Sequence, residues 1–496
     1  MKTAQLKMSI SISHVCKLLT VVLVIGSFGY LEASTNDSLK VSIGTILTAG
    51  NKDFQPHWIV SNRYGVIQDR KSDASTNFRL SNSHRFDLRR GTALDSLEAL
   101  TLSYGLNIFN NNGFDDFLFG EAFAKLKYRN VEFRAGRYRS PSGEMDQELS
   151  TGSFGISPNA LPIPRISLVI PEYVDLPYSG GFVKIKGSLS HGWMGNNQHL
   201  KKAFLHEKSL YAKFGKNRFR IFAGLQHFGV WGGQRGEFKL DRSFAGFLDV
   251  LMVKEANDGS LDTALYPGTR PNRAGDQRGL IEYGAEWENN DRLIRIYNQT
   301  PFESGKGIDV RNIDRLLGAS IFFKGNRRAL KKIVFEFIYT KQMEDFGGRE
   351  RQSYYNNGVY RTGWEYETRV IGTPLFTNLF RASKFLDVTA PDWKSDEYTL
   401  RGNGNIVNNR ILGGHVGLDY QISTSLSTRT LLTYTVNNGS LNKNIPILSK
   451  QQVYFMQDFS LQLSDKVDFN LALGYDTGEM YKNLGVLFGV KYAIFK

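Results

Sequence analysis

One stretch of the sequence, residues 354–366, combines the side-chain types that proteins use to hold sugars. It reads Tyr354-Tyr-Asn-Asn-Gly-Val-Tyr-Arg-Thr-Gly-Trp-Glu-Tyr366. Aromatic rings stack on the C–H faces of sugars, amides bond the hydroxyls, and guanidinium groups attract acidic units. The candidate polysaccharide-binding residues are therefore Tyr354, Tyr355, Asn356, Asn357, Tyr360, Arg361, Trp364 and Tyr366, with Trp231 from an earlier segment. The alternatives are that the loop aromatics pack their own segment together, and that Trp231 is an interfacial anchor.

Three histidines suggest metal chemistry at first sight: His191, His206 and His227. They fall on separate predicted strands, and no short ligand spacing links them. We therefore expect their imidazoles to make orienting hydrogen bonds inside the fold, and we expect no metal site there.

An acidic cluster lies in a predicted loop: Glu144, Asp146 and Glu148. Such carboxylates can hold calcium or act as the pair of a glycosidase, but a solvated loop is the simpler interpretation. The sequence contains no G-x-S-x-G elbow, P-loop or H-E-x-x-H run. We therefore expect neither an enzyme nor a cofactor.

The chain carries a basic excess and a secretory signal. Lys and Arg number 62 against 48 Asp and Glu, giving a formal net charge of +14, which favours an acidic partner such as a polysaccharide or lipopolysaccharide. Residues 1–33 place lysines before an apolar run at 18–28, as a signal peptide does. Secretion argues against a nucleic-acid partner. The only cysteine, Cys16, lies within this signal, so the mature chain is predicted to have no thiol chemistry.

The elements that must position these residues are strands. Near the C-terminus, Leu484, Val486, Phe488, Val490, Tyr492 and Ile494 alternate with Gly485, Leu487, Gly489, Lys491 and Ala493. Strand side chains alternate between faces, so one face is wholly apolar and the other is small or polar. The same alternation recurs along the mature chain, and a segment of about 12 residues suits a tilted strand crossing a bilayer. Residues 34–496 are therefore predicted to form one transmembrane antiparallel β-barrel of about 18 strands.

The connections alternate between short and long, as expected for short periplasmic turns and long extracellular loops. The two longest predicted loops run from Gly229 to Arg278 and from Lys341 to Arg410. Loops of that length are usually functional. Within the first, residues 243–252 are predicted to form one short helix that plugs the lumen or lines its mouth.

A series of motifs resembles the Wzi capsule-assembly family. They are Leu149–Arg165, Ile170-Pro-Glu-Tyr173, His191-Gly-Trp193, Leu205-His-Glu-Lys208, Gly224–Gly233, Tyr354-Tyr-Asn-Asn and Gly363-Trp-Glu-Tyr366. The resemblance implies an outer-membrane barrel lectin that binds capsular polysaccharide and helps attach it to the cell surface, with no catalytic residues. The family also has a small periplasmic helical bundle near its N-terminus, whereas residues 37–90 here read as strands and turns.

Three functions remain open from the sequence. The first is a non-enzymatic surface lectin for capsular or exopolysaccharide, acting as a monomer in the outer membrane among its lipids and lipopolysaccharide. The second is a porin or sugar-export channel whose inward-facing charges line a pore or pair across a closed lumen: Lys125, Lys127, Arg218, Arg220, Glu282 and Glu286. The third, an outer-membrane hydrolase or acyltransferase, lacks a recognisable nucleophile and base.

Overall fold

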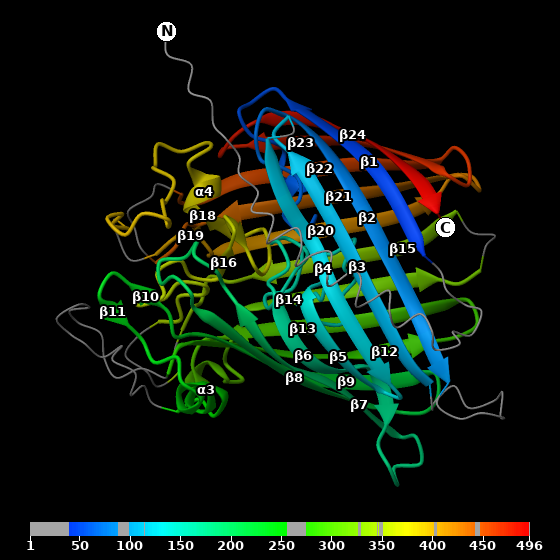
Figure 1. The fold of residues 1–496 in the computed structure, drawn as a ribbon, viewed down its shortest axis with the longest axis horizontal. Helices are drawn as coiled ribbons and strands as arrows, with labels where there is room; N and C mark the ends of the chain where they lie inside the picture. Colours follow the sequence, from blue (N-terminus) through cyan, green and yellow to red (C-terminus); the bar gives the residue numbers. More distant parts are fainter. Residues whose placement is uncertain are drawn as a thin grey trace, which may run out of the picture.

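The structure is a computed structural model that describes residues 39–87, 99–113, 115–254, 274–325, 329–344, 346, 351–400, 404–441 and 447–495. The predicted signal peptide, with Cys16, lies outside the described residues. One sheet of 18 antiparallel strands closes on itself as a barrel, which confirms the predicted fold (Figure 1).

The barrel strands follow one another in chain order. They are β1 (Lys40–Gly50), β2 (Ser72–Asp87), β3 (Ala99–Asn111), β4 (Asp116–Tyr128), β5 (Val131–Arg137), β6 (Arg165–Asp175), β7 (Val183–Trp193), β8 (Phe204–Phe214), β9 (Phe219–Trp231), β12 (Asp276–Glu288), β13 (Arg292–Phe302), β14 (Arg315–Phe323), β15 (Leu330–Tyr339), β20 (Ile411–Gln421), β21 (Leu426–Asn437), β22 (Lys450–Gln462), β23 (Val467–Gly478) and β24 (Asn483–Phe495).

The outer wall of the barrel is apolar, as the alternation predicts. On β24 the side chains of Leu484, Phe488 and Tyr492 are 52%, 40% and 43% exposed, while the intervening Gly485 and Leu487 face inward and are buried. Exposed large apolar side chains recur on the outward register of other strands, for example Tyr283 on β12 and Phe335 on β15. A continuous apolar wall of this kind is stable only against lipid.

The long connections that the structure describes leave the barrel at one end (Figure 1). The connection between β2 and β3, residues 88–98, lies outside the described residues. This long-loop rim carries residues 51–71, 138–164, 194–203, 232–275, 303–314, 340–410 and 438–449. The opposite, short-turn rim carries 129–130, 176–182, 215–218, 289–291, 324–329, 422–425 and 463–466, and both β1 and β24 have their free ends there. Two connections on the long-loop rim, 112–115 and 479–482, are short, so the alternation is general but not strict. Short turns mark the periplasmic side of such barrels.

The remaining elements are short and lie in the long connections. They are α2 (His57–Val60), β10 (Gln234–Arg235), β11 (Phe238–Lys239), α3 (Phe244–Leu251), η3 (Gly305–Gly307), β16 (Glu365–Tyr366), β17 (Arg369–Val370), β18 (Thr377–Asn378), α4 (Leu379–Ala382) and β19 (Ile406–Asn408). Residues 39–87 hold two strands and the four-residue α2 but no helical bundle, in keeping with the sequence. Among the described helices, none combines the length and hydrophobicity needed to cross a membrane.

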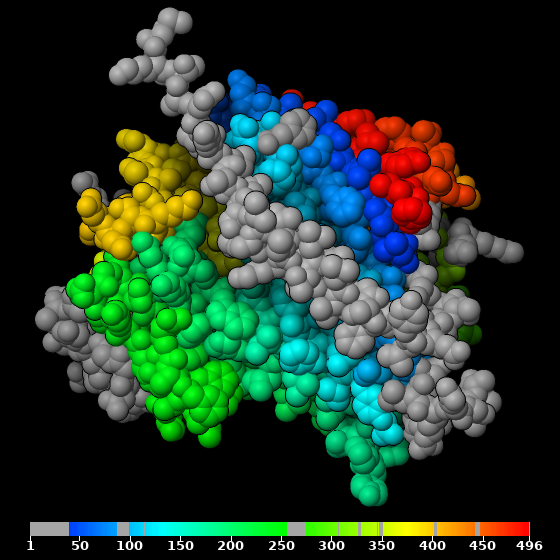
Figure 2. Space-filling view, in the orientation of Figure 1, coloured from blue at the N-terminus to red at the C-terminus, as the bar shows by residue number. Residues whose placement is uncertain are grey.

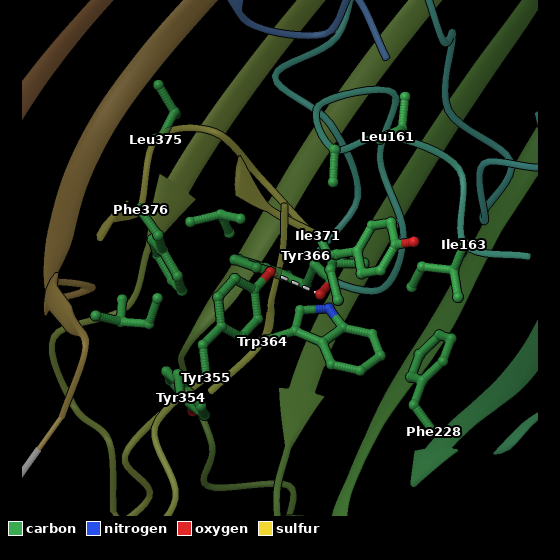
Figure 3. Packing of buried hydrophobic residues seen from close by; sticks show 14 of the residues in the cluster. Leu161, Ile163, Phe228, Tyr354, Tyr355, Trp364, Tyr366, Ile371, Leu375 and Phe376 are labelled. Carbon is green, nitrogen blue, oxygen red and sulfur yellow. Dashed lines mark hydrogen bonds between the residues drawn. The ribbon is translucent and has the colours of Figure 1, made fainter. Parts of the chain in front are cut away.

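The apolar core lies inside the barrel. Segments 51–71, 138–164 and the described parts of 340–410 fold inward from the long-loop rim, and we call them the luminal plug. Their fully buried Trp58, Leu149 and Trp364 belong to one cluster with inward-facing strand residues such as Leu316 and Val334. Figure 3 shows part of this cluster, in which labelled residues of segments 138–164 and 340–410 lie close to Phe228 of β9. The lumen is therefore occupied by ordered loop structure.

The barrel closes where β1 pairs with β24. Residues 51–71 follow β1 and bond the last strands from inside the barrel. The backbone N–H of His57 donates to Asp476 Oδ2 at 2.7 Å, and Asn483 Nδ2 donates to the Phe54 carbonyl at 2.8 Å. The seam is thus held both by its strand edges and by the plug.

Candidate functional site

The predicted sugar-binding stretch lies in the middle of the luminal plug. Tyr354, Tyr355, Asn356, Tyr360, Trp364 and Tyr366 are all buried, and Trp364 is 0% exposed. The Tyr355 hydroxyl donates to the Phe154 carbonyl at 2.6 Å (Figure 3). Trp364 Nε1 donates to the Gly155 carbonyl at 2.7 Å. These aromatics therefore join segment 340–410 to segment 138–164, as the packing alternative predicts, and present no ring face to solvent.

The phenols of this stretch are structural groups. Tyr354 donates to Asp314 Oδ2 at 2.8 Å, and the Tyr366 hydroxyl accepts from Arg137 Nη2 at 3.1 Å. Burial raises the pKa of Tyr354, Tyr355 and Tyr366 above the ordinary tyrosine value. They stay protonated under all physiological conditions and serve as hydrogen-bonding supports.

Two predicted residues of the loop, Asn357 and Arg361, are only half-buried. The Asn357 side chain accepts from the backbone N–H groups of Val359 and Tyr360, both at 2.9 Å, which fixes a turn. The ninth predicted residue, Trp231, is buried but lies on the outer wall of the barrel, away from the plug. The structure therefore does not bring the nine predicted residues together as one exposed site.

A network of largely buried charged side chains holds the stretch 353–364 in place. Glu303 accepts from the backbone N–H of Tyr355 at 2.7 Å and of Ser353 at 3.0 Å. Arg278 lies 3.5 Å from Glu303 Oε1, and its guanidinium stacks 4.9 Å from the Trp364 ring. Burial raises the pKa of Glu303, although Arg278 opposes that effect. Buried charges that are paired and hydrogen-bonded in this way fix one loop conformation.

A second carboxyl, Glu365, ties together three parts of segment 340–410. Asn405 Nδ2 donates to Glu365 Oε2 at 2.5 Å, Asn378 Nδ2 donates at 2.6 Å, and Trp393 Nε1 donates to Oε1 at 3.2 Å. Burial raises the pKa of Glu365 to about 7. The folded rim of the plug is therefore held by a carboxyl that titrates near neutrality.

The long-loop rim near Glu365 carries a basic surface. We call its members the rim basic cluster: Lys201, Lys202, Arg235, Arg361 and Lys394. Lys201 Nζ lies 2.9 Å from Asp396 Oδ1 and donates to the Lys394 carbonyl at 2.8 Å, while Arg235 donates to the His199 carbonyl at 3.2 Å. Figure 2 shows the rim segments near residues 200–250, in green, side by side with those near 380–400, in yellow. Three loops distant in sequence thus form one surface.

His199 joins the segments that carry the two arginines, because its carbonyl accepts from Arg235 at 3.2 Å and its backbone N–H donates to Thr362 Oγ1, next to Arg361, at 2.6 Å. Burial, followed by the charges of Arg235 and Arg361, lowers the pKa of His199 to about 3. The Trp393 ring packs edge-on against Tyr398 at 5.5 Å, which positions the half-buried Tyr398 ring within the same surface. The surface therefore combines fixed cations with an aromatic ring. Sequence analysis missed it because no local spacing links these residues, and only the net charge pointed to it.

Below the plug rim, inside the barrel, lies a cavity of about 320 Å³. It lies between the wall formed by β5–β9 and segment 138–164, and its polar and aromatic lining includes Arg134, Lys186, Glu207, Tyr211, Gln226 and Phe228. Amides, serines and aromatic rings in one cavity are compatible with a sugar, but Lys186 and Glu207 already form ion pairs with Glu144 and Arg165.

The inward-facing charges around Glu286 form ion pairs between neighbouring strands of one wall, and not across the lumen as one alternative predicts. Glu286 is surrounded by Arg295 at 2.8 Å, Lys213 at 3.0 Å and Arg220 at 3.1 Å. Glu282 accepts from the Tyr211 hydroxyl at 2.6 Å. The predicted pore-lining Lys127 and Arg218 are exposed at the short-turn rim, and Lys125 is half-buried beside the Phe123 ring.

The acidic cluster differs from the predicted solvated loop. Glu144 and Asp146 are buried inside the barrel, where Glu144 pairs with Lys186 and Asp146 pairs with Lys332. Only Glu148 is exposed. The carboxylates balance inward-facing lysines, and among the described residues no group of His, Cys, Asp and Glu is arranged to hold a metal ion.

The three histidines and the 243–252 helix are predicted to lie inside the barrel, but the structure places them on its outer side. His191, His206 and His227 share the outward register of β7, β8 and β9. Helix α3 forms as predicted, but it packs over them from outside, with Phe247 5.6 Å from the His206 ring. It therefore neither plugs the lumen nor lines its mouth. Alternation assigns two faces to a strand but does not exclude a loop that covers the outer one.

Comparison with known proteins places the chain by its fold. No protein-family model matches it, and no curated protein matches it. Among solved structures it is similar to Wzi, a carbohydrate-binding outer-membrane β-barrel involved in group 1 capsule assembly in Escherichia coli, with 12% identity, a TM-score of 0.53, and coverage of 96% of this chain and 87% of that chain. OpdL of Pseudomonas aeruginosa is 10% identical, with a TM-score of 0.47 and coverage of 93% and 99%. The likeness defines the class, a closed 18-strand barrel of the outer-membrane type.

Proposed function

We propose that this chain is a non-enzymatic surface protein of the outer membrane that binds an acidic capsular or exopolysaccharide and helps attach it to the cell. The observation that carries the proposal is the luminal plug. Three long loops pack into the barrel around Trp58 and Trp364, and the rim basic cluster stands on the segments that this plug holds in place. A rigid outward surface is useful for binding, whereas an occupied lumen disfavours conduction.

The chemistry of the rim suits an acidic sugar chain. Lys202 and Lys394 are exposed, and the Arg235 guanidinium is fixed by backbone carbonyls of two loops. Carboxylate or sulfate groups on successive sugar units would meet these cations, while the Tyr398 ring offers an apolar face to a sugar ring. Each contact is weak, but a repeating polymer engages several such sites at once.

The similarity in fold supports the same class of function. Wzi is itself described as a carbohydrate-binding barrel involved in capsule assembly. The motifs at 149–165, 224–233 and 354–366, which carry the resemblance in sequence, form the plug and the strand next to it. We assign the buried predicted residues of 354–366 a positioning role: they hold the plug, and through it the rim, in one conformation. Trp231, on the outer wall, has no part in this role.

Charge reversal at the rim tests the proposal. The double variant Lys202→Glu with Lys394→Glu is expected to bind an acidic polysaccharide at least about tenfold more weakly at low salt, because it replaces attraction by repulsion. Binding is measured by titration calorimetry on the purified full chain, and capsule retention is measured on cells. Both residues are exposed, so the barrel is expected to fold normally.

Lys466→Glu is the matched control, because Lys466 is an equally exposed lysine on the short-turn rim. It is expected to leave polysaccharide affinity and capsule retention unchanged. Equal affinity of the rim double variant and the parent chain would contradict the proposal, as would equal losses in both variants.

A channel is the second candidate, favoured by the cavity of about 320 Å³ and by the exposed charges Lys127 and Arg218 near the short-turn rim. Planar-bilayer recording separates the two functions. The packed plug predicts no steady current at moderate voltage in the parent chain. A steady, salt-dependent open current would favour the channel instead.

A further inference from the structure

Helix α3 is attached to the outside of the barrel. The exposed Leu189, Leu210 and Leu225 mark the outward register of β7, β8 and β9. Phe204 and Trp231 belong to the same register and pack with α3 through Phe247, whose ring lies 6.0 Å from that of Trp231. Figure 1 shows α3 beside the loop-bearing ends of these strands. The helix therefore lies on the wall that faces lipid.

The attachment is specific. Val250 is 2% exposed, and its Cγ1 would lie 2.9 Å from a Cβ added at Gly229, so only a glycine there lets the helix approach the wall this closely. Lys208, which points outward from β8, donates from Nζ to the Leu251 carbonyl at the helix C-terminus. A positive charge is favourable at that end of a helix. One face of α3 is thus sealed against the barrel.

The opposite face of α3 is also apolar. Phe244, Leu248 and Met252 follow one another at intervals of four residues and are 73%, 37% and 66% exposed. Residues four apart share one side of a helix, so they form a single stripe. A helix that is apolar on both faces needs apolar surroundings on both. The stripe continues the lipid-facing wall at the level of the long-loop rim.

Two cations precede the stripe in the chain. Lys239 and Arg242 are exposed just before the helix, and the Arg242 guanidinium lies 4.6 Å from the Phe204 ring. Neither forms an ion pair with any residue that the structure describes, whereas Asp249 is already paired with Lys254 at 3.0 Å. A cation next to an exposed apolar stripe complements a molecule that joins acyl chains to phosphate.

We propose that α3 is an interfacial helix of the outer leaflet that binds a phosphorylated lipid. The acyl chains lie along Phe244, Leu248 and Met252, and the phosphate lies against Lys239 and Arg242. This lipid site goes beyond the proposed polysaccharide function, since it lies on the outer wall and involves no residue of the rim basic cluster.

Two measurements on the full chain in nanodiscs test the site. Leu248→Trp is expected to gain tryptophan fluorescence that is quenched by brominated acyl chains but not by aqueous iodide. Nanodiscs of phosphatidylcholine with added diphosphorylated lipid A are then compared with phosphatidylcholine alone. Lipid A retained by the purified protein is expected to fall at least about tenfold in Lys239→Glu with Arg242→Glu.

Controls keep the result interpretable. Val310→Asp changes an exposed apolar residue, 100% exposed on the same rim, and is expected to retain lipid A as the parent chain does. Heat-modifiable migration on gels verifies that every variant has a folded barrel. Quenching by iodide alone, unchanged lipid A in the charge variant, or a dimer that Leu248→Asp but not Val310→Asp dissociates would each overturn the proposal, the last by making a second copy the occupant.

Discussion

Glu365 is the residue whose surroundings most directly connect pH with structure. Its carboxyl is inaccessible to solvent, and its oxygens accept from Asn378, Asn405 and Trp393. These bonds favour the charged form, but burial outweighs them and raises the pKa to about 7. The group lies at the base of the rim, so its ionisation bears on whether segment 340–410 stays folded.

Because the folded pKa lies above the ordinary value, the stability that the neutral acid contributes is complete below about pH 4.5 and is lost as pH rises through about 7. The full loss is at most about 3 kcal/mol. The hydrogen-exchange protection factors of residues 365–400 and 404–408, which are corrected for intrinsic exchange, are therefore expected to fall between about pH 6 and pH 8. Glu365→Gln is expected to remove this pH dependence, whereas the exposed Glu397→Gln retains it. A pH-independent parent chain would contradict the assignment.

The residue types of 354–366 predicted contacts through aromatic rings and amides. They did not predict whether these side chains face solvent or pack inside the barrel. Tyr354, Trp364 and Tyr366 have the composition of a sugar site and also that of a core, and composition does not distinguish them. Burial decided the matter, because the partners of these side chains, such as Gly155 and Asp314, come from other loops. That information is not local in the sequence.

At the scale of the elements, Trp364 is a central packing residue of the plug. Its ring is fully buried against Phe228, its N–H bonds the Gly155 carbonyl, and Arg278 stacks on it. Truncation removes all of these contacts and leaves a cavity between two segments of the plug.

Trp364→Ala is expected to destabilise the plug by about 3–5 kcal/mol. Pulse proteolysis of segment 340–410 in increasing urea measures the loss, while heat-modifiable migration verifies that the barrel itself survives. Trp193→Ala is the matched control, since Trp193 faces outward at a strand end and is 42% exposed. Comparable protease sensitivity in the two variants would refute the central role given to Trp364.

The strands were predicted more accurately than the loops for a physical reason. In a strand that spans lipid, every second residue faces the acyl chains and must be apolar. Strands such as β24 and β12 can therefore be predicted from the alternation alone. Helix α3 was also predicted from its own residues. Its docking on the outer wall depends on Gly229 and Lys208 in other strands, which no pattern within the helix encodes.

At the scale of the whole molecule, the number of strands and the common rim of the long loops follow from the sequence, because lipid imposes one rule on the entire wall. The interior obeys no such rule. Its contacts join residues hundreds of positions apart, for example Trp58 of the plug with Thr433 of the wall at 3.1 Å. The plug and the rim basic cluster therefore emerge only in three dimensions.

The double fastening of the β1–β24 seam has a consequence for biogenesis. Pairing of β1 with β24 and packing of the first loop are coupled, because Asn51 accepts from the backbone of Leu484 and Phe54 from the side chain of Asn483. We therefore expect the first loop to lie inside the barrel when the last strand pairs with β1. A factor that inserts this chain into the membrane would then have to keep the barrel open between β1 and β24 until the first loop has packed inside.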